Sequence, residues 1–309
     1  MKSYSLKKPN YINAAVLFKK NTPLKILKLK IPKLKTGQVL IKLIYSGICR
    51  SQLMEIGGLR GKDPYLPHLL GHEGFGQVIE IGPKVKKVKV GQKVILSWIK
   101  GKGINADGPI YYFNETRINA GPITTFSDFT IIAENRVSAA PKSINPIEGV
   151  LFGCAVPTGS GMVFNELKIN SKKTIAIFGV GGIGIFSLIA CKILKVKKIV
   201  AIDINEKKLH IAKKLGATDI VNPLKENLVK KINIITSGKM IDYAIDCAGK
   251  VNTIEDAFNI INNNGTCIFA SHPEKNKKIK IDPFELIKGK KIIGTWGGSV
   301  NPDIDLRKL

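Results

Sequence analysis

The segment from Ile175 to Gly184 constrains the fold of this 309-residue chain more than any other. A short apolar run, Thr174–Phe178, predicts a buried strand, and it breaks into the pattern Gly179-x-Gly181-x-x-Gly184. An apolar helical pattern follows the glycines, and Lys198–Asp203 predicts a second strand. The segment therefore predicts a strand–turn–helix–strand unit that carries glycines at its turn.

The glycines of this unit suit the binding of a dinucleotide. Gly179 permits the tight turn, Gly181 lets a pyrophosphate approach the backbone, and Gly184 lets the helix pack close to the strand. The helix N-terminus offers free N–H groups and a partial positive charge to the phosphates. Asp203 is positioned to accept hydrogen bonds from ribose hydroxyls, which favours NAD over NADP. The predicted cofactor-binding residues of this unit are therefore Gly179, Gly181, Gly182, Gly184 and Asp203; the alternative is a turn that binds no ligand.

Strands and helices alternate from about residue 156 onwards. Further predicted strands are Asp219–Val221, Ile241–Asp246, Gly265–Ala270 and Lys290–Thr295, and further predicted helices are Leu209–Leu215 and Thr253–Ile261. This alternation is typical of a doubly wound parallel sheet.

The first half of the chain, up to about residue 155, is predicted to be rich in strands. The predicted strands are Ile12–Phe18, Val39–Tyr45, Gly76–Gly82 and Gly91–Ser97. Gly and Pro follow one another at short intervals, as in a small barrel. Residues 99–123 are polar and aromatic without clear periodicity, so they are predicted to form a surface lobe or a long loop.

Composition excludes several classes of protein. No apolar run approaches the roughly 20 residues that span a bilayer, so no membrane segment is predicted. The lysines before Ile12–Phe18 faintly resemble a signal peptide, but this run is short and lacks a cleavage site, so a cytoplasmic protein is predicted. The five cysteines are odd in number, widely spaced and without a CxxC pair, which argues against a disulfide framework.

The formal net charge of +26 raises the question of a nucleic-acid partner. The excess is almost entirely lysine, and the lysines are spread along the chain. No basic stripe alternates with aromatic residues. We therefore interpret the charge as a compositional bias and predict no nucleic-acid site.

Three potential metal ligands precede the nucleotide-binding unit, each within two residues of a glycine: Cys49, His72 and Cys154. Two cysteines and one histidine are a ligand set of catalytic zinc sites, which keep a fourth position open for water or substrate. Taken singly, each cysteine is more often a small buried apolar residue and the histidine a hydrogen-bonded packing residue. Their joint occurrence with flanking glycines favours one catalytic Zn²⁺.

Together these segments resemble the zinc-dependent medium-chain dehydrogenase/reductase family of the alcohol dehydrogenase type. The resemblance runs from about residue 12 to about residue 305. The motifs that carry it are Gly47-Ile-Cys-Arg-Ser51, Gly71-His-Glu-Gly-Phe-Gly76, Gly82-Pro with Val90-Gly-Gln-Lys-Val94, Gly153-Cys-Ala-Val-Pro-Thr-Gly159 and Gly179-Val-Gly-Gly-Ile-Gly184. The resemblance implies a GroES-like catalytic domain over 1–155 and a Rossmann NAD-binding domain over 156–296.

The resemblance also implies roles for single residues. Cys49, His72 and Cys154 would hold the zinc, Glu73 would lie behind it, and Ser51 would take the substrate's proton. Arg50 matches a pyrophosphate contact, Thr158 a residue that packs against the nicotinamide, and Lys208 a cation near the ribose. The implied activity is NAD-linked oxidation of a small alcohol or polyol, or reduction of an aldehyde or ketone. A homodimer through Gly289–Gly294 is also implied.

The chain departs from the family pattern at several points. Residues 95–125 contain no cysteine, so no structural zinc is expected. Gln52 stands where many relatives carry an aspartate that orients the zinc-binding histidine, and we expect it to accept a hydrogen bond without bringing a charge. Relatives continue beyond Leu309, so residues 297–309 are expected to begin a truncated return to the catalytic domain, with Pro302–Leu309 starting a helix.

Two alternatives to a zinc-dependent dehydrogenase stay open. The first is a zinc-free reductase of the same superfamily that acts on quinones or enones. The second is an inactive, truncated remnant that binds a nucleotide.

Overall fold

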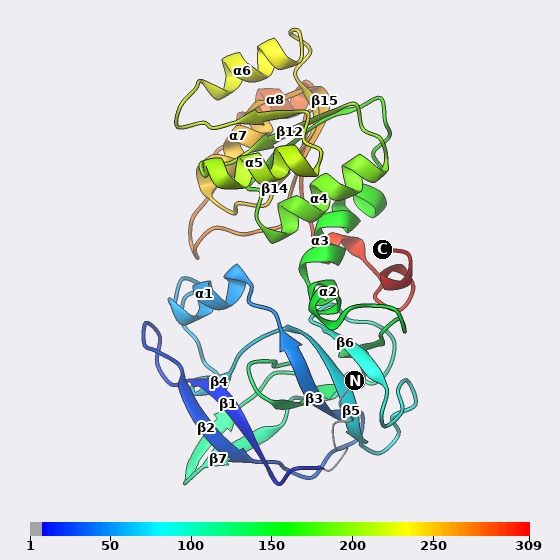
Figure 1. The fold of residues 1–309 in the computed structure, drawn as a ribbon. Helices are drawn as coiled ribbons and strands as arrows, with labels where there is room; N and C mark the ends of the chain where they lie inside the picture. Colours follow the sequence, from blue (N-terminus) through cyan, green and yellow to red (C-terminus); the bar gives the residue numbers. More distant parts are fainter. Residues whose placement is uncertain (1–7) are drawn as a thin grey trace. The chain divides into compact units, whose positions relative to one another are not determined.

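The computed structural model describes residues 8–309, so the first seven residues of the predicted domain 1–155 lie outside the described residues. Figure 1 shows the fold. The chain divides into two units, one comprising residues up to Cys154 together with Asn301–Leu309, and the other comprising Ala155–Val300. Each unit is described separately below.

The first unit contains two five-stranded sheets, ordered β2-β1-β4-β8-β7 and β10-β6-β5-β3-β9. The strands are β1 Tyr11–Leu17, β2 Lys25–Lys30, β3 Gln38–Ser46, β4 His68–Leu69, β5 Glu73–Ile81, β6 Lys93–Ser97, β7 Ile110–Phe113, β8 Thr116–Asn119, β9 Phe129–Ala133 and β10 Val137–Ala139. The prediction that this half is rich in strands is confirmed.

Strand β5 begins at Glu73, three residues before the predicted start at Gly76. The strand includes Gly74 and Gly76, where the neighbouring strand β3 leaves no room for a side chain. A Cβ atom on Gly76 would meet the carbonyl oxygen of Lys42 at 2.5 Å. Glycine inside a strand often marks such a close approach, and here it places Glu73 in a sheet.

The prediction of a lobe or loop over residues 99–123 is wrong for its centre. Strands β7 and β8 form an antiparallel hairpin there, with Tyr111 opposite Ile118 and both buried. Asn114 turns the hairpin with a φ of 52°, a conformation that Asn adopts more readily than most residues. Period-two patterning over four residues is too short to stand out in a sequence.

The second unit contains a six-stranded sheet, ordered β13-β12-β11-β14-β15-β16, in which every pair is parallel. The strands are β11 Thr174–Phe178, β12 Lys198–Ile202, β13 Asp219–Val221, β14 Ile241–Asp246, β15 Ile261–Phe269 and β16 Lys291–Gly294. This is the 3-2-1-4-5-6 order of doubly wound dinucleotide-binding domains, in which ligands bind where the order reverses. The prediction of a doubly wound parallel sheet is confirmed.

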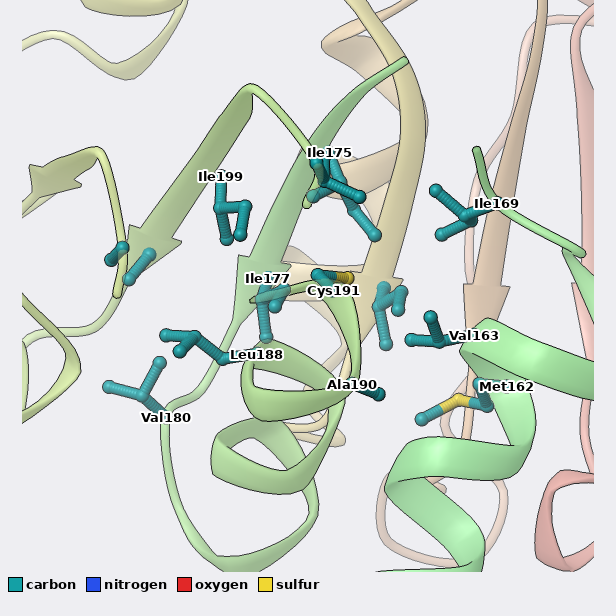
Figure 2. Close-up of a cluster of buried hydrophobic side chains, with 14 of the residues drawn as sticks. Met162, Val163, Ile169, Ile175, Ile177, Val180, Leu188, Ala190, Cys191 and Ile199 are labelled. Atoms are coloured by element: carbon teal, nitrogen blue, oxygen red, sulfur yellow. The ribbon is translucent and has the colours of Figure 1, made fainter. Parts of the chain in front are cut away.

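The alternation of side chains along β11 divides the core of this unit into two layers. Ile175 and Ile177 pack with Leu188 of helix α4, Gly182–Ile193, on one face (Figure 2). Ala176 and Phe178 join the buried cluster on the other face. Successive strand residues point to opposite faces, so a continuous apolar strand fits only a sheet covered on both sides.

The α-helices are α1 Arg50–Ile56, α2 Pro146–Gly149, α3 Ala155–Gly161, α4 Gly182–Ile193, α5 Glu206–Leu215, α6 Leu228–Ile235, α7 Val251–Asn259 and α8 Pro283–Ile287. Helix α7 ends at Asn259, and the predicted last residue, Ile261, begins β15 instead. The prediction extended too far because adjacent isoleucines fit the periodicity of a helix and of a strand. Helices α1, α2, α3, α6 and α8 were not predicted. In Pro302–Leu309 the predicted helix is limited to a 3₁₀ turn, Asp305–Arg307.

No single helix among residues 8–309 is long and apolar enough to cross a membrane. Two bent helical segments, Pro146–Gly153 and Ala155–Glu166, pass that test only when they are taken together.

Glu134 supports the first unit through three backbone N–H groups. Its Oε1 accepts from Lys86 and Lys87 at 2.7 and 2.8 Å, and its Oε2 accepts from Ile104 at 2.8 Å. Burial alone would raise the pKa of Glu134, but these donors and the Lys87 cation outweigh it, so the pKa lies below its usual 4.5. The ionised form is therefore the one that stabilises the fold.

We expect Glu134→Ala to lower the free energy of unfolding by about 1–3 kcal/mol, because three backbone donors lose their acceptor. The difference in stability between the two proteins should have its full size above pH 4.5 and should shrink as the pH falls through the lowered pKa of Glu134. Urea denaturation of the variant and of the exposed control Glu115→Ala measures it. Equal stability of the two variants near neutral pH would contradict this role for Glu134.

Candidate functional site

The first unit brings Cys49, His72 and Cys154 together from three separate segments. Their ligand atoms all lie within 4.8 Å of one another. Cys49 caps the N-terminus of α1, His72 directly precedes β5, and Cys154 directly follows the 3₁₀ helix Val150–Gly153. The spacing suits one metal ion bound by two sulfurs and one nitrogen.

Two glycines allow these segments to converge around Glu73. A Cβ atom on Gly47 would meet the Glu73 Cδ at 2.6 Å, and a Cβ on Gly153 would meet the Glu73 Cβ at 2.7 Å. Larger residues at either position would push a ligand segment away. The glycine flanks seen in the sequence therefore have a steric cause.

The two cysteine sulfurs hold opposite protonation states. The Cys154 thiol donates a hydrogen bond to Cys49, which outweighs burial and lowers the pKa of Cys49 to about 3. The same hydrogen bond, together with burial, raises the pKa of Cys154 well above its usual value. Cys49 is thus a thiolate at neutral pH, and a thiolate is the form of cysteine that binds a metal.

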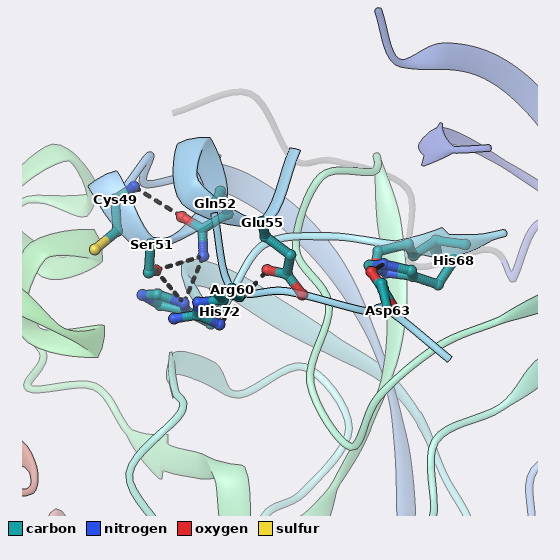
Figure 3. Close-up of polar contacts among 9 residues, drawn as sticks. Cys49, Ser51, Gln52, Glu55, Arg60, Asp63, His68 and His72 are labelled. Carbon is teal, nitrogen blue, oxygen red and sulfur yellow. Dashed lines mark hydrogen bonds and ion pairs between the residues drawn. The ribbon is translucent and has the colours of Figure 1, made fainter. Parts of the chain in front are cut away.

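His72 contacts the neighbouring residues through one edge of its ring. Its Nδ1 lies 2.5 Å from Gln52 Nε2 and 3.4 Å from Ser51 Oγ (Figure 3). Its Nε2 is buried without a hydrogen-bond partner. The ring packs edge-on to Trp98, with centroids 6.4 Å apart and planes at 60°. Nε2 is therefore the nitrogen that remains for a metal.

Gln52 does not act toward His72 as the sequence led us to expect. Its oxygen accepts from the backbone N–H of Cys49 at 2.8 Å, so its amide nitrogen faces the ring. The amide does accept a hydrogen bond, as expected, but it accepts from Cys49 and not from the histidine. The backbone N–H at the start of α1 takes the oxygen, and a sequence does not show this competition.

Glu73 is buried close to all three potential ligands. It is 4% exposed, and its Oε2 has no hydrogen-bond partner. Burial raises the pKa of Glu73 to about 7. This carboxyl group therefore changes charge near neutral pH, although most carboxyl groups in proteins are ionised there.

Arg50 and Ser51 lie in the first turn of α1, directly after Cys49. Ser51 Oγ receives a hydrogen bond from Gln52 Nε2 at 3.2 Å. Arg50 is exposed on the same turn. The structure thus groups these two predicted residues with the three predicted ligands.

The second unit places Asp203 over the glycine turn between β11 and α4. The backbone N–H of Val180 donates to Asp203 Oδ2 at 3.0 Å. Gly179 has a φ of +79°, which favours glycine. A Cβ on Gly184 would meet the carbonyl oxygen of Gly179 at 2.1 Å, whereas a Cβ on Gly181 would meet nothing within 4 Å.

The remaining predicted residues of this unit differ in exposure. Gly182 is the first residue of α4. Thr158 lies on α3, 3% exposed, with its Oγ1 unpartnered. Lys208 lies on α5, exposed. The open space at Gly181 and the unpartnered Thr158 hydroxyl are both compatible with a ligand.

A second group of possible metal ligands, Glu55, Asp63 and His68, also lies in the first unit. Asp63 Oδ2 lies 2.9 Å from His68 Nε2, and the other ring nitrogen contacts the Leu69 carbonyl at 2.8 Å. Arg60 approaches Glu55 at 3.9 Å. With both nitrogens engaged and a cation already nearby, we assign no metal to this group.

Comparisons with known proteins agree with the two units. Residues 35–142 match the family described as alcohol dehydrogenase GroES-like domain, and residues 182–308 match zinc-binding dehydrogenase. S-(hydroxymethyl)glutathione dehydrogenase of Synechocystis sp. is 30% identical over 316 residues, which cover 93% of this chain and 85% of that protein. The same-named protein of Photobacterium damsela subsp. piscicida is 31% identical, with the same coverage.

Solved structures are similar along nearly the whole chain. Benzyl alcohol dehydrogenase from Acinetobacter calcoaceticus superposes with a TM-score of 0.87 at 26% identity, covering 96% of this chain and 87% of that one. An alcohol dehydrogenase zinc-binding domain protein from Burkholderia ambifaria gives 0.88 at 25% identity, covering 97% and 87%. The fold is that of a GroES-like domain joined to a Rossmann domain. The chain belongs to the zinc-dependent medium-chain alcohol dehydrogenase family, and it is an oxidoreductase.

The raised pKa of Glu73 predicts a pH effect on the stability of the metal-free protein. Between pH 4.5 and about 7 the folded state keeps a proton that the unfolded chain has lost, so Glu73 lowers stability as the pH rises through this window. Glu73→Gln cannot ionise. We therefore expect the stability of the variant, relative to the unsubstituted protein, to rise by up to about 3 kcal/mol across the window.

Urea denaturation at both ends of the window measures this difference, and the exposed Glu148→Gln provides the control. The comparison isolates Glu73 because the other groups titrate in both proteins. A stability difference that does not vary with pH would show that the carboxyl group titrates normally.

Proposed function

We propose that the chain transfers hydride between a small alcohol or polyol, or the corresponding aldehyde or ketone, and NAD(H), with one catalytic zinc. The convergence of Cys49, His72 and Cys154 on one point is the observation that carries this proposal. A zinc-free reductase of the same superfamily would not need two sulfurs and an unpartnered imidazole nitrogen within one ion's reach.

The residues present fit a zinc ion. Cys49 is a thiolate and His72 Nε2 is buried without a partner. Cys154 would release its proton to solvent on binding the metal. Zinc bound there would act as a Lewis acid toward an alcohol or carbonyl oxygen. Because residues 95–125 carry no cysteine, we propose this zinc alone and no structural one.

Ser51 and Glu73 are the residues we propose for handling protons and charge. Ser51 Oγ has a donor on one side, Gln52, and can accept the substrate's proton while its own hydrogen passes outward. Glu73 lies close to the ligands, where its negative charge would compensate the positive charge of a bound cation. Its buried position suits an electrostatic role.

The second unit supports NAD as the cofactor. The space above Gly181 and the N–H groups at the start of α4 suit a pyrophosphate. Asp203 at the end of β12 suits the ribose hydroxyls and would repel the extra phosphate of NADP. We assign Thr158 to the nicotinamide, Lys208 to the ribose and Arg50 to the pyrophosphate.

The relatives suggest which substrates to test first. S-(hydroxymethyl)glutathione and benzyl alcohol appear in the names of similar proteins. We propose alcohols of this kind, each with a hydroxymethyl group, as substrates. We also propose a homodimer that extends the Rossmann sheet at β16, which is an edge strand of that sheet.

Zinc content tests the proposed centre directly. We expect about one zinc per chain in the unsubstituted protein and almost none in Cys49→Ala, because removal of one of three ligands disrupts the site. Elemental analysis measures the metal, with Cys267→Ala as a matched control because this buried cysteine lies on β15. Oxidation of benzyl alcohol, S-(hydroxymethyl)glutathione and a wider alcohol panel should follow the metal content.

Three outcomes would contradict parts of this proposal. Reduction of quinones or enones without zinc would favour the zinc-free reductase. NAD binding without turnover on any substrate would favour an inactive remnant. Equal loss of zinc in Cys49→Ala and Cys267→Ala would indicate unfolding instead of loss of a ligand.

Asp203 predicts the choice of cofactor. We expect Asp203→Ala to weaken NAD binding about tenfold, the loss of roughly 1.4 kcal/mol that hydrogen bonds to the ribose would supply. Binding of NADP should weaken less or improve, because the carboxylate no longer repels the extra phosphate. Fluorescence titration with both cofactors measures the ratio. The exposed Asp107→Ala is the control. An unchanged NAD/NADP ratio in Asp203→Ala would remove Asp203 from cofactor selection.

A further inference from the structure

A hydrogen bond from the backbone N–H of Cys49 fixes the orientation of the Gln52 amide. The backbone N–H of Cys49 can only donate, and it lies 2.8 Å from Gln52 Oε1. Gln52 occupies the third position of α1 and is 2% exposed, so solvent offers it no other partner. The amide oxygen therefore faces Cys49, and the NH₂ group faces the other way.

The NH₂ group points at two atoms (Figure 3). Its nitrogen lies 3.2 Å from Ser51 Oγ and 2.5 Å from His72 Nδ1. An amide NH₂ has hydrogens to donate and no lone pair to offer in their place. His72 Nδ1 must therefore be the acceptor, and an accepting Nδ1 carries no proton.

This contact decides where the neutral imidazole keeps its single proton. With Nδ1 bare, the proton lies on Nε2, the nitrogen that has no hydrogen-bond partner. A metal needs a lone pair on the nitrogen that binds it. In this arrangement Nε2, the nitrogen available to zinc, carries the proton and has no lone pair to offer.

We propose that Gln52 is a positioning residue that holds metal-free His72 in the tautomer that cannot bind zinc through Nε2, and so weakens zinc binding. This inference rests on the proposed zinc site. When zinc binds, the ring proton must move from Nε2 to Nδ1, so the ring keeps one proton throughout. On Nδ1 that proton meets the Gln52 NH₂ group, and two donors face each other.

Rotation of the amide does not remove this conflict. If Gln52 turned its oxygen toward His72, its NH₂ group would face the N–H of Cys49, again donor against donor. The Cys49 N–H would then lose its acceptor at the start of α1. An amide has one accepting end and one donating end, whereas this position needs two acceptors once zinc is bound.

Gln52→Glu supplies those two acceptors with almost no change in shape. One carboxylate oxygen can accept from Cys49 and the other from His72 Nδ1–H. We expect the zinc dissociation constant, measured by competition with a chelator, to fall about tenfold or more. Leu53→Glu controls for charge, because it adds the same charge on an adjacent side chain that is 60% exposed.

Gln52→Leu tests the direction of the effect without adding any charge. It removes the opposing NH₂ group, so we expect zinc to bind at least as tightly as in the unsubstituted protein. Weaker zinc binding in Gln52→Leu would mean that the amide supports the metal-bound state, and it would overturn the proposal. Tightening of equal size in Gln52→Glu and Leu53→Glu would overturn it too.

Nitrogen-15 NMR of the metal-free protein measures the tautomer itself. We expect His72 to be protonated at Nε2 in the unsubstituted protein and at Nδ1 in Gln52→Glu. A ring protonated at Nδ1 in the unsubstituted protein would refute the proposal even if Gln52→Leu failed to fold. Absence of zinc from every variant, with the expected NMR result, would instead contradict the proposed zinc function and leave the tautomer assignment standing.

Discussion

The backbone hydrogen bonds that join β3, β5 and β6 hold in place the segments that carry the three potential metal ligands. Glu73 pairs with Ser97 across β5 and β6, and Gly74 pairs with Ser46 across β5 and β3. The Ser97 hydroxyl donates to the Gly153 carbonyl at 2.7 Å. Cys49 follows Ser46 by three positions, His72 directly precedes Glu73, and Cys154 directly follows Gly153. Each potential ligand is therefore close in sequence to a residue that the sheet holds. Rigid placement of this kind is what a metal site requires of its scaffold.

The same ladder explains why a carboxyl group is buried where three potential ligands meet. Glu73 fills the space that Gly47 and Gly153 leave open, and its Oε2 has no partner. An unpaired buried carboxylate is costly, and the raised pKa is the consequence. A bound cation would compensate that charge. The arrangement is costly for the metal-free protein and becomes favourable when a cation is present.

Much of this architecture could be predicted from sequence because it depends on local patterns. The apolar run before Gly179 and the spacing to Asp203 predicted the nucleotide-binding unit, since both follow from the periodicity of strands and helices. The ligand triad could be inferred only from motifs in combination, because the sheet that gathers its members is not local. The Tyr111–Ile118 hairpin was missed since its pattern is short. The orientation of Gln52 was missed because two donors compete for one oxygen, and only the three-dimensional structure shows which donor that oxygen accepts from.

Gln52 illustrates how the demands of folding and of metal binding meet in one side chain. The start of α1 needs an acceptor for the Cys49 N–H, and an amide oxygen serves it as well as a carboxylate does. Zinc at His72 Nε2 needs a second acceptor for Nδ1–H, which a carboxylate has and an amide lacks. An amide at this position therefore satisfies the helix at the expense of the metal-bound state. Because the two donors lie at opposite ends of one amide, rotation of the side chain only exchanges the donor that loses its acceptor, and the cost falls on zinc affinity.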